Sequence, residues 1–459
     1  MSGVVECGIL RAVPKKMKVL SLNFNQKGIG TYRRSFYFSR ELARAGHDVT
    51  LVTVSRDSRF RRRLSYKRDW CGESSQPTGD GPWIRHIEGP SWGYRFLPGW
   101  GSGPLDIWQR FSEILNGDFN VVIGFEHHPN VSWPVYLTKW RRPFWFISDW
   151  CDWFAGSSNQ FLGWKFAHRV DAYLEERIRL SAEVVSVTSR ALFQRAVSLG
   201  VPPERLVRIP EGAATDYIFP SDCAEARKRF GLPLDVPILV QVRNGNMCRE
   251  VRIFNEVLRN VPNALFVFVG KPSNDAVVLA EQLGISRHIV CTGWVSELDY
   301  PRYLACADVC VSPLDDNLDD RARWPAKILD FLSAGRATVT NPIGEVEFLL
   351  QEHPIAALAG PSDQEMAEEV VSLLEDPERR THLGEYASRV MKEEWDWRVR
   401  GPLIESLLES PKRSSKKDVI GSGPALVRHG AGPSQRVHTL SGSLKTRAND
   451  TRQSKRSQK

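Results

Sequence analysis

The stretch KVLSLNFNQKGIGTYRRSFYFSRELARAGHDVTLVTV, residues 18–54, contains a pattern that the rest of the chain repeats. Its two ends, KVLSLNF and DVTLVTV, are rich in Val and Leu and favour buried β-strands. The glycine turn KGIGTYRR follows the first end and leads into a segment long enough for a helix. A strand, a helix and a strand in this order are typical of a parallel sheet.

The same alternation continues along the chain and then starts again. Strand candidates that complete the first series are Asn120–Phe125, Pro143–Ser148 and Glu183–Ser189. The second series consists of Pro237–Val242, Ala264–Gly270, His288–Gly293, Val309–Leu314 and Ala337–Asn341. We therefore predict an α/β protein with two Rossmann-like, doubly wound parallel-sheet domains, residues 17–210 and 211–410. Ligands of such sheets bind at the carboxyl ends of the strands, and two facing domains form a cleft there.

The positive charge of the 459-residue chain is concentrated at its C-terminus. Its formal net charge is +8, and residues 411–459 hold 12 of the 62 Lys and Arg but only 2 of the 54 Asp and Glu. This tail is also rich in Ser and Gly, so we expect a basic, disordered segment rather than a nucleic-acid site. Residues 1–16 are expected to form an N-terminal extension.

Neither a membrane-spanning segment nor a metal site is indicated. No apolar run approaches the roughly 18 to 20 residues of a membrane span, and residues 1–16 lack a signal peptide's apolar block, so we expect a cytoplasmic protein. The eight cysteines are scattered without a CxxC pair, which favours neither zinc nor disulfides. The basic loop RDSRFRRRLSYKRDW, residues 56–70, suits anionic lipid headgroups, although a solvated loop is the commoner explanation.

The stretch RWPAKILDFLSAGRATVTNP, residues 323–342, predicts a helix from near Pro325 to Gly335 with an unusual charge at its start. Arg321, Arg323 and Lys327 lie at its first turn, where the helix dipole disfavours cations and attracts anions. We therefore expect an anionic ligand there. Neutralisation by the preceding aspartates is an alternative that fits the two arginines better than Lys327.

Three other motifs carry weaker signals. VGKPS, residues 269–273, lacks the earlier glycine of a P-loop and is interpreted as a strand end and turn. Gly28 and Gly30 lie in a strand-to-helix turn, where phosphate binding and a plain tight turn both remain open. His127 and His128 are adjacent near a strand end, so one of them could hydrogen-bond a substrate or be structural.

The chain resembles GT-B glycosyltransferases, in particular the retaining, family 4-like or group 1 type, over about residues 17–408. The resemblance rests on the opening stretch, on AEVVSVTSRALFQRAVSLGVPPERLVRIPEGAATDYIFP, on VCTGWVSELDYPRYLACADVCVSPL and on PAKILDFLSAGRATVTNPIGEVEFL, in the family's order. It implies a second domain that holds a nucleotide diphosphate sugar, UDP- or GDP-linked, and a first domain that holds the acceptor. No other cofactor and no metal is implied.

Several site residues follow from this resemblance. It implies that Arg243 and Arg249 grip the diphosphate together with Lys327, near Gly28 and Gly30. Asp330 lies where a Glu usually takes the ribose hydroxyls, and eight residues earlier Ala322 replaces a Glu near the donor sugar. Candidate catalytic groups are His127, His128 and Asp330. The side chains would then stabilise the departing diphosphate without a metal.

We expect a metal-independent glycosyltransferase that uses a glycan, lipid-linked or small-molecule acceptor in polysaccharide or glycolipid assembly. Contact with an anionic membrane surface is a further expectation, and no nucleic-acid partner is expected. Two alternatives stay open at this point: a nucleotide-sugar epimerase of the same fold, and a sugar-nucleotide-binding protein that Ala322 has left catalytically impaired.

Overall fold

The computed structural model describes residues 16–56, 60–92, 103–155 and 165–409. These residues group into one compact unit, which contains both sheets. The extension expected before Met17 and the basic tail from residue 411 onward fall outside the described residues. The boundary predicted at residues 210 and 211 therefore stays a prediction.

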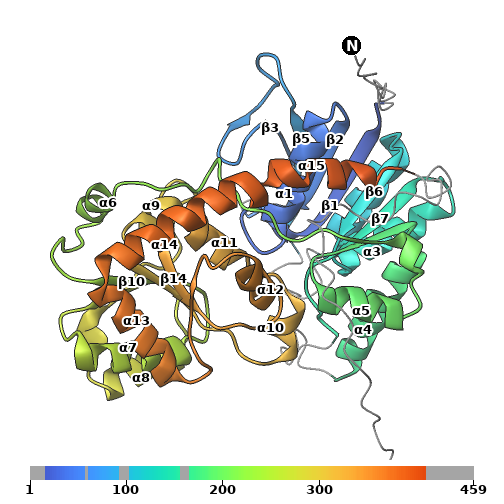
Figure 1. The fold of residues 1–459 in the computed structure, drawn as a ribbon. Coiled ribbons are helices and arrows are strands. Elements are labelled where there is room, and N and C mark those ends of the chain that lie inside the picture. The colour runs from blue at the N-terminus through green and yellow to red at the C-terminus, as the bar shows by residue number, and fades with distance from the viewer. Residues whose placement is uncertain (1–15, 57–59, 93–102, 156–164, 410–459) are drawn as a thin grey trace, which may run out of the picture. The chain divides into compact units, whose positions relative to one another are not determined.

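The first half of the chain forms a nine-stranded sheet (Figure 1). The strand order is β4-β3-β5-β2-β1-β6-β7-β8-β9, and every pairing is parallel except those of β3. The strands are β1 (Lys18–Gln26), β2 (Asp48–Val54), β3 (Arg63–Lys67), β4 (Glu73–Ser74), β5 (Ile84–Gly89), β6 (Val121–Phe125), β7 (Trp145–Trp150), β8 (Val184–Val187) and β9 (Leu206–Arg208).

The second half forms a six-stranded, entirely parallel sheet in the order β12-β11-β10-β13-β14-β15. Its strands are β10 (Ile238–Val242), β11 (Leu265–Val269), β12 (Ile289–Cys291), β13 (Val309–Ser312), β14 (Ala337–Thr340) and β15 (Ala357–Leu358). The prediction of two doubly wound parallel sheets is confirmed, and each of the ten predicted strands overlaps an observed one.

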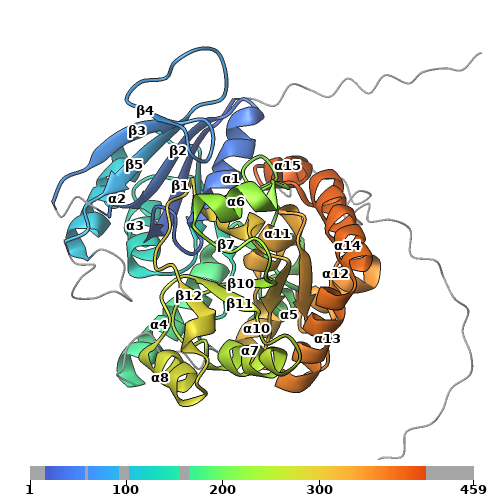
Figure 2. The same cartoon turned by 90° about the vertical axis from the view of Figure 1, so that its left-hand side faces the viewer.

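Helices pack along both sheets and connect most of the parallel strands (Figures 1 and 2). They are α1 (Tyr32–Arg44), α2 (Pro104–Asn116), α3 (Pro129–Lys139), α4 (Lys165–Ser181), α5 (Arg190–Ser198), α6 (Cys223–Arg229), α7 (Cys248–Asn260), α8 (Asn274–Gln282), α9 (Tyr300–Ala305), α10 (Leu318–Ala322), α11 (Ala326–Ser333), α12 (Glu345–Glu352), α13 (Asp363–Glu375), α14 (Pro377–Val390) and α15 (Trp397–Ser406). Since parallel strands need crossover connections, this alternation of strands and helices follows from the sequence pattern.

The basic stretch from Arg56 to Trp70 differs from the predicted loop. Within it, Arg63–Lys67 forms strand β3, which pairs antiparallel with β5. Arg62 forms an ion pair with Glu113 at 2.8 Å, and Arg63 forms one with Glu73 at 3.0 Å. These two cations are therefore neutralised within the protein, which weakens the case for this stretch as a lipid-binding loop.

The last helix of the unit returns to the first sheet. Helix α15 packs against α1, where Trp397 stacks on Tyr37 with ring centroids 5.5 Å apart. The indole of Trp145 on β7 also donates a hydrogen bond to the carbonyl oxygen of Leu407 at 3.1 Å. This helix, which follows the second sheet in sequence, thus contributes to the core around the first sheet.

Candidate functional site

A cavity of about 550 Å³ lies where the carboxyl ends of the two sets of strands meet. In the first half it is lined by residues that follow β1, β7 and β8, and in the second half by residues at or just after the ends of β10, β11 and β13. Five of the predicted site residues line it: Gly28, Gly30, Arg243, Lys327 and Asp330. This is where a doubly wound fold is expected to bind its ligand.

Lys327 is the cation that the helix pattern singled out. Helix α11 begins at Ala326, directly after Pro325, and its first turn borders the cavity. Arg321 and Arg323 pair with Asp316 and Asp320, as the alternative interpretation expected. In contrast, the Lys327 amine makes neither a hydrogen bond nor an ion pair with any residue that the structure describes.

Burial and nearby cations both act on the charge of Lys327. Desolvation, together with repulsion from Arg243 and Arg323, lowers the pKa of Lys327 to about 8. A phosphate beside the amine would favour the charged form and reverse this shift. A lysine without a hydrogen bond or ion pair at the start of a helix, on the wall of a cavity, favours an anion subsite, although Glu250 and Asp320 partly offset the neighbouring cations.

Arg243 extends this positive wall from the end of β10. Its guanidinium donates to Glu250 at 3.0 Å and is about one third exposed. The backbone here also approaches β11 closely: Gly270 has φ +140°, and a Cβ at that position would lie 2.1 Å from the carbonyl oxygen of Arg243. Glycine at position 270 thus permits the strand ends to converge on the cavity.

Gly28 shows how closely the first half approaches the second. It has φ +79°, and a Cβ there would lie 3.2 Å from a carboxylate oxygen of Glu297. Both residues line the cavity. The glycine turn after β1 therefore lets the backbone pass beside a carboxylate from the second half.

Asp330 lies one helical turn after Lys327, and both of its carboxylate oxygens are occupied. One accepts from Arg33 of helix α1, and the other accepts from the Tyr300 hydroxyl at 2.7 Å. The Arg33 guanidinium also lies over the rings of Trp70 and Tyr217, at 5.5 and 6.0 Å. A ribose bound to Asp330 would compete with Arg33 and Tyr300 for this carboxylate. The contact between Arg33 and Asp330 joins the two halves, and sequence reasoning missed it.

His127 and His128 do not line the cavity. Both are buried beside Phe154, and His128 packs on Phe24 with ring centroids 3.8 Å apart. His127 Nε2 lies 3.1 Å from Asp171 of α4. Although burial alone would lower the pKa of His127, the neighbouring carboxylates of Asp171 and Glu126 raise it to about 9.

Glu126 holds the turn that carries the two histidines. It is a buried, non-glycine residue with φ +67°, a conformation that costs energy and requires support. Its carboxylate accepts from the Cys151 amide at 2.6 Å and from Arg179 at 2.9 Å. These contacts fix the position of His127 at the end of β6.

The fold also creates a potential metal-binding group that sequence spacing did not reveal. Ligand atoms of His127, His128 and Asp171 all lie within 4.8 Å of one another. Asp171 comes from α4, far from the histidines in sequence, so no local motif could have indicated it. Our prediction of a reaction without metal therefore needs a direct test.

Two predicted positions are not on the cavity wall. The Arg249 guanidinium is engaged elsewhere, with the Leu314 carbonyl oxygen at 2.8 Å, Asp315 at 2.6 Å and Asp363 at 3.1 Å. Ala322 is fully buried, and its carbonyl oxygen accepts a hydrogen bond from the Ser189 hydroxyl. The structure thus brings Arg243 and Lys327 to the cavity and leaves Arg249 and Ala322 outside its lining.

Two carboxyl groups of the cavity were also missed. Burial, with repulsion from Glu126, raises the pKa of Asp152 to about 7, and burial raises that of Glu211 to about 7. Both residues line the cavity from the first half. They follow β7 and β9, so their position at a strand's carboxyl end was the signal that could have found them.

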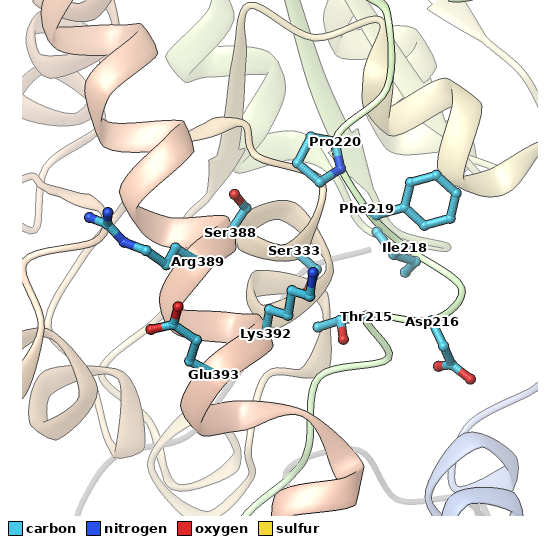
Figure 3. A pocket seen from close by; sticks show the side chains of 10 residues that line it. All are labelled: Thr215, Asp216, Ile218, Phe219, Pro220, Ser333, Ser388, Arg389, Lys392 and Glu393. Carbon is cyan, nitrogen blue, oxygen red and sulfur yellow. The ribbon is translucent and has the colours of Figure 1, made fainter.

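A second cavity of about 700 Å³ lies between the segment Thr215–Pro220 and the end of α14 (Figure 3). Its charged groups do not converge: Asp216 and Arg389 point in opposite directions in Figure 3. Asp216 is already bound by Arg40 and by the Tyr37 hydroxyl. We therefore place the functional site in the cavity between the strand ends.

Comparison with known proteins identifies the family of the chain. Residues 30–217 match the family described as Glycosyltransferase Family 4, and residues 242–376 match Glycosyl transferases group 1, so the two matches together cover well over half of the chain. The residues that line the cavity, other than Gly28 and Ile29, fall within one or the other matched region.

Individual proteins show the same likeness. The chain is 28% identical over 250 residues to the GDP-mannose-dependent alpha-(1-6)-phosphatidylinositol monomannoside mannosyltransferase of Mycolicibacterium smegmatis, covering 52% of this chain and 65% of that protein. It is 26% identical over 226 residues to the alpha-D-kanosaminyltransferase of Streptomyces kanamyceticus, covering 46% of this chain and 56% of the relative. These matches span less than two thirds of either relative.

A solved structure supports the fold over a longer span. The sucrose-phosphate synthase of Thermosynechococcus elongatus superposes with a TM-score of 0.64 at 14% identity, covering 85% of this chain and 98% of the other. Such low identity shows a shared fold alone. Because both family models match and the chain forms two separate parallel sheets of this fold, the chain belongs to the family 4 and group 1 glycosyltransferases of GT-B fold.

Proposed function

We propose that this protein transfers a sugar from a nucleotide diphosphate sugar to a glycan or lipid-linked acceptor. The observation that carries the proposal is the cavity at the strand ends, where Lys327 has no partner among the described residues and lies one helical turn from Asp330. A nucleoside diphosphate presents phosphates, which a lysine can bind, and ribose hydroxyls, which can donate to a carboxylate.

The transfer breaks the bond between the anomeric carbon and a phosphate oxygen, and it forms a bond to an acceptor oxygen. Negative charge grows on the departing diphosphate as that bond breaks. Lys327, Arg243 and the first-turn amides of α11 would stabilise this charge, since preorganised donors act most strongly where charge develops. Asp330 would take the ribose once Arg33 has moved aside.

GDP-mannose is the first donor to test, because the mycolicibacterial relative is named as GDP-mannose-dependent. The kanosaminyltransferase relative favours keeping other sugars in the panel. For the acceptor, the name of the first relative points to a phosphatidylinositol mannoside, which is a glycolipid. UDP-linked and ADP-linked sugars serve as the comparison set.

The test is a product analysis. The full chain is incubated with each nucleotide sugar, with and without a glycolipid acceptor, and the products are identified by mass spectrometry and NMR. A new glycoside supports the proposal. An epimerised nucleotide sugar formed without acceptor would support the epimerase alternative, and binding without turnover would support the impaired protein.

We also propose that transfer retains the anomeric configuration and needs no metal. The first part rests on the resemblance to retaining enzymes, and the second on the cations available to the diphosphate. NMR of the first-formed product should show the donor's anomeric configuration, and EDTA should leave the rate unchanged. An inverted product would overturn the first part. Loss of activity with EDTA would overturn the second and direct attention to His127, His128 and Asp171.

A further inference from the structure

The first half of the molecule exposes large apolar side chains on three neighbouring helices, α2, α3 and α4. The side chain of Trp140 is 93% exposed, that of Trp108 66% and that of Leu137 53%. We call this surface the α2–α4 face, and its apolar members are Leu105, Trp108, Trp133, Leu137, Trp140, Tyr173 and Leu180. Exposed apolar surface of this extent usually marks an interaction site.

The topology explains why these helices share a face. The chain moves from β6 to β7 to β8 in one direction along the sheet, and right-handed crossovers then place α3 and α4 on the same side. The step from β1 to β2 runs the other way and places α1 on the opposite side. Helix α2 packs against α3, and the two lie at the left of Figure 2.

Direct contacts join the three helices into one surface. Arg142, just beyond α3, donates to the Leu115 carbonyl oxygen of α2 at 3.0 Å, and Lys139 donates to the Ser181 carbonyl oxygen of α4 at 2.7 Å. Within α3, Trp133, Leu137 and Trp140 are spaced by four and three residues. They therefore point outward from the same side of the helix.

Two cations on this face are not neutralised by the protein. Arg141 lies over Phe111 at 5.7 Å and Arg177 lies over Tyr173 at 5.8 Å, and neither forms an ion pair or hydrogen bond with any described residue. Lys139, in contrast, pairs with Glu183 at 2.8 Å. The face thus combines tryptophans with uncompensated guanidinium groups.

We propose that the α2–α4 face docks onto the surface of an anionic lipid bilayer. Trp and Tyr are the residues that settle at the boundary between headgroups and acyl chains, and cations beside them attract anionic headgroups. No helix among the described residues has the length and hydrophobicity needed to cross a membrane, so this contact would be peripheral. A second copy suits the face less well, since a two-fold interface would bring identical cations together.

This docking does not depend on the proposed transfer reaction and is tested without donor. The full chain is sedimented with vesicles of phosphatidylcholine alone and with vesicles of phosphatidylcholine and phosphatidylglycerol in equal parts. We compare wild type with Trp108→Ser/Trp140→Ser and with Arg141→Gln/Arg177→Gln. Arg252→Gln/Arg259→Gln removes the same charge from exposed positions on α7 and serves as the matched control.

Wild type should bind the anionic vesicles more tightly than the neutral ones. Loss of two headgroup contacts at roughly 1 kcal/mol each predicts about thirtyfold weaker binding for the arginine variant. The affinity of the tryptophan variant for anionic vesicles should fall at least about tenfold, because two interfacial indole rings are lost. The α7 control should bind almost as tightly as wild type.

Equal binding of all variants would overturn the proposal and assign vesicle binding to another part of the chain, such as residues 411–459. If the α7 control loses as much affinity for anionic vesicles as the arginine variant, binding depends on net charge alone and the proposal is overturned. Light scattering without vesicles tests whether a second copy of the chain covers the α2–α4 face. A dimer in wild type that is lost in the tryptophan variant would also overturn the proposal. Unchanged thermal unfolding confirms that each variant is folded.

Discussion

Charged side chains at the carboxyl edges of the two sheets differ in whether they have partners within the protein. At the first sheet, two buried arginines are paired inside the protein: Arg34 holds Asp149 through two contacts of 2.8 and 3.0 Å, and Arg179 holds Glu126 at 2.9 Å. At the second sheet, Lys327 faces the cavity with no partner among the described residues. The paired charges are explained by the fold itself, whereas the unpaired cation is available to a ligand.

The largest expected effect comes from breaking a pair in the first half. Arg34→Met leaves the Asp149 carboxylate buried without its cation, so the free energy of unfolding should fall by about 3–5 kcal/mol. Denaturant titration of Arg34→Met and of Arg321→Met, which breaks an exposed pair, gives the comparison. A similarly small change in both variants would mean that the buried pair is not structural.

The next effect concerns the contact between the halves at Asp330. Arg33 competes with a ribose for this carboxylate, so Arg33→Ala should tighten guanosine diphosphate binding about threefold to tenfold, the worth of one hydrogen bond. Asp330→Ala should weaken it. Calorimetric titration of both variants measures these opposite signs, and weaker binding by Arg33→Ala would show that Arg33 itself holds the nucleotide.

A smaller effect is expected from pH. Between pH 7 and 9 the amine of Lys327, whose pKa is lowered to about 8, loses its charge, and the carboxyl groups of Asp152 and Glu211, with pKa values near 7, become fully ionised. All three changes disfavour an anion, so the affinity for guanosine diphosphate should be lower at pH 9 than at pH 7. The decrease should be smaller than about tenfold. Guanosine is the control, and a parallel decline for guanosine would contradict an effect on phosphate.

Much of the fold could be predicted because strand and helix periods are local properties. Apolar runs such as Asp48–Val54 identify strands without tertiary information. Strand β3 was missed because the polar and charged sequence RLSYK at Arg63–Lys67 has no apolar run. This strand pairs antiparallel with β5 in the first sheet, outside the parallel pattern. β5 was missed for a related reason, since IRHIEG mixes apolar and charged residues.

The site was predictable only where the signal was local. Lys327 was found because a cation is unfavourable at its position in a helix, and Asp330 because of the resemblance to the family. Arg33 and Asp171 could not be found, since each meets its partner across a long sequence separation. For Arg249, in contrast, the resemblance predicted a ligand contact that the structure does not show. Its spacing from Arg243 fits the family, but in the structure its guanidinium is held by Asp315 and Asp363.

The central claim is that Lys327 and Arg243 form an anion subsite for a diphosphate. It is tested most directly by calorimetric titration of Lys327→Ala with guanosine diphosphate, guanosine monophosphate and guanosine, with Arg321→Ala as the control cation. One hydrogen bond to a charged group is worth roughly 1.5–3 kcal/mol, so diphosphate binding should weaken about tenfold to a hundredfold while guanosine binding stays unchanged. Equal losses for all three ligands would show that Lys327 is structural and would contradict the subsite.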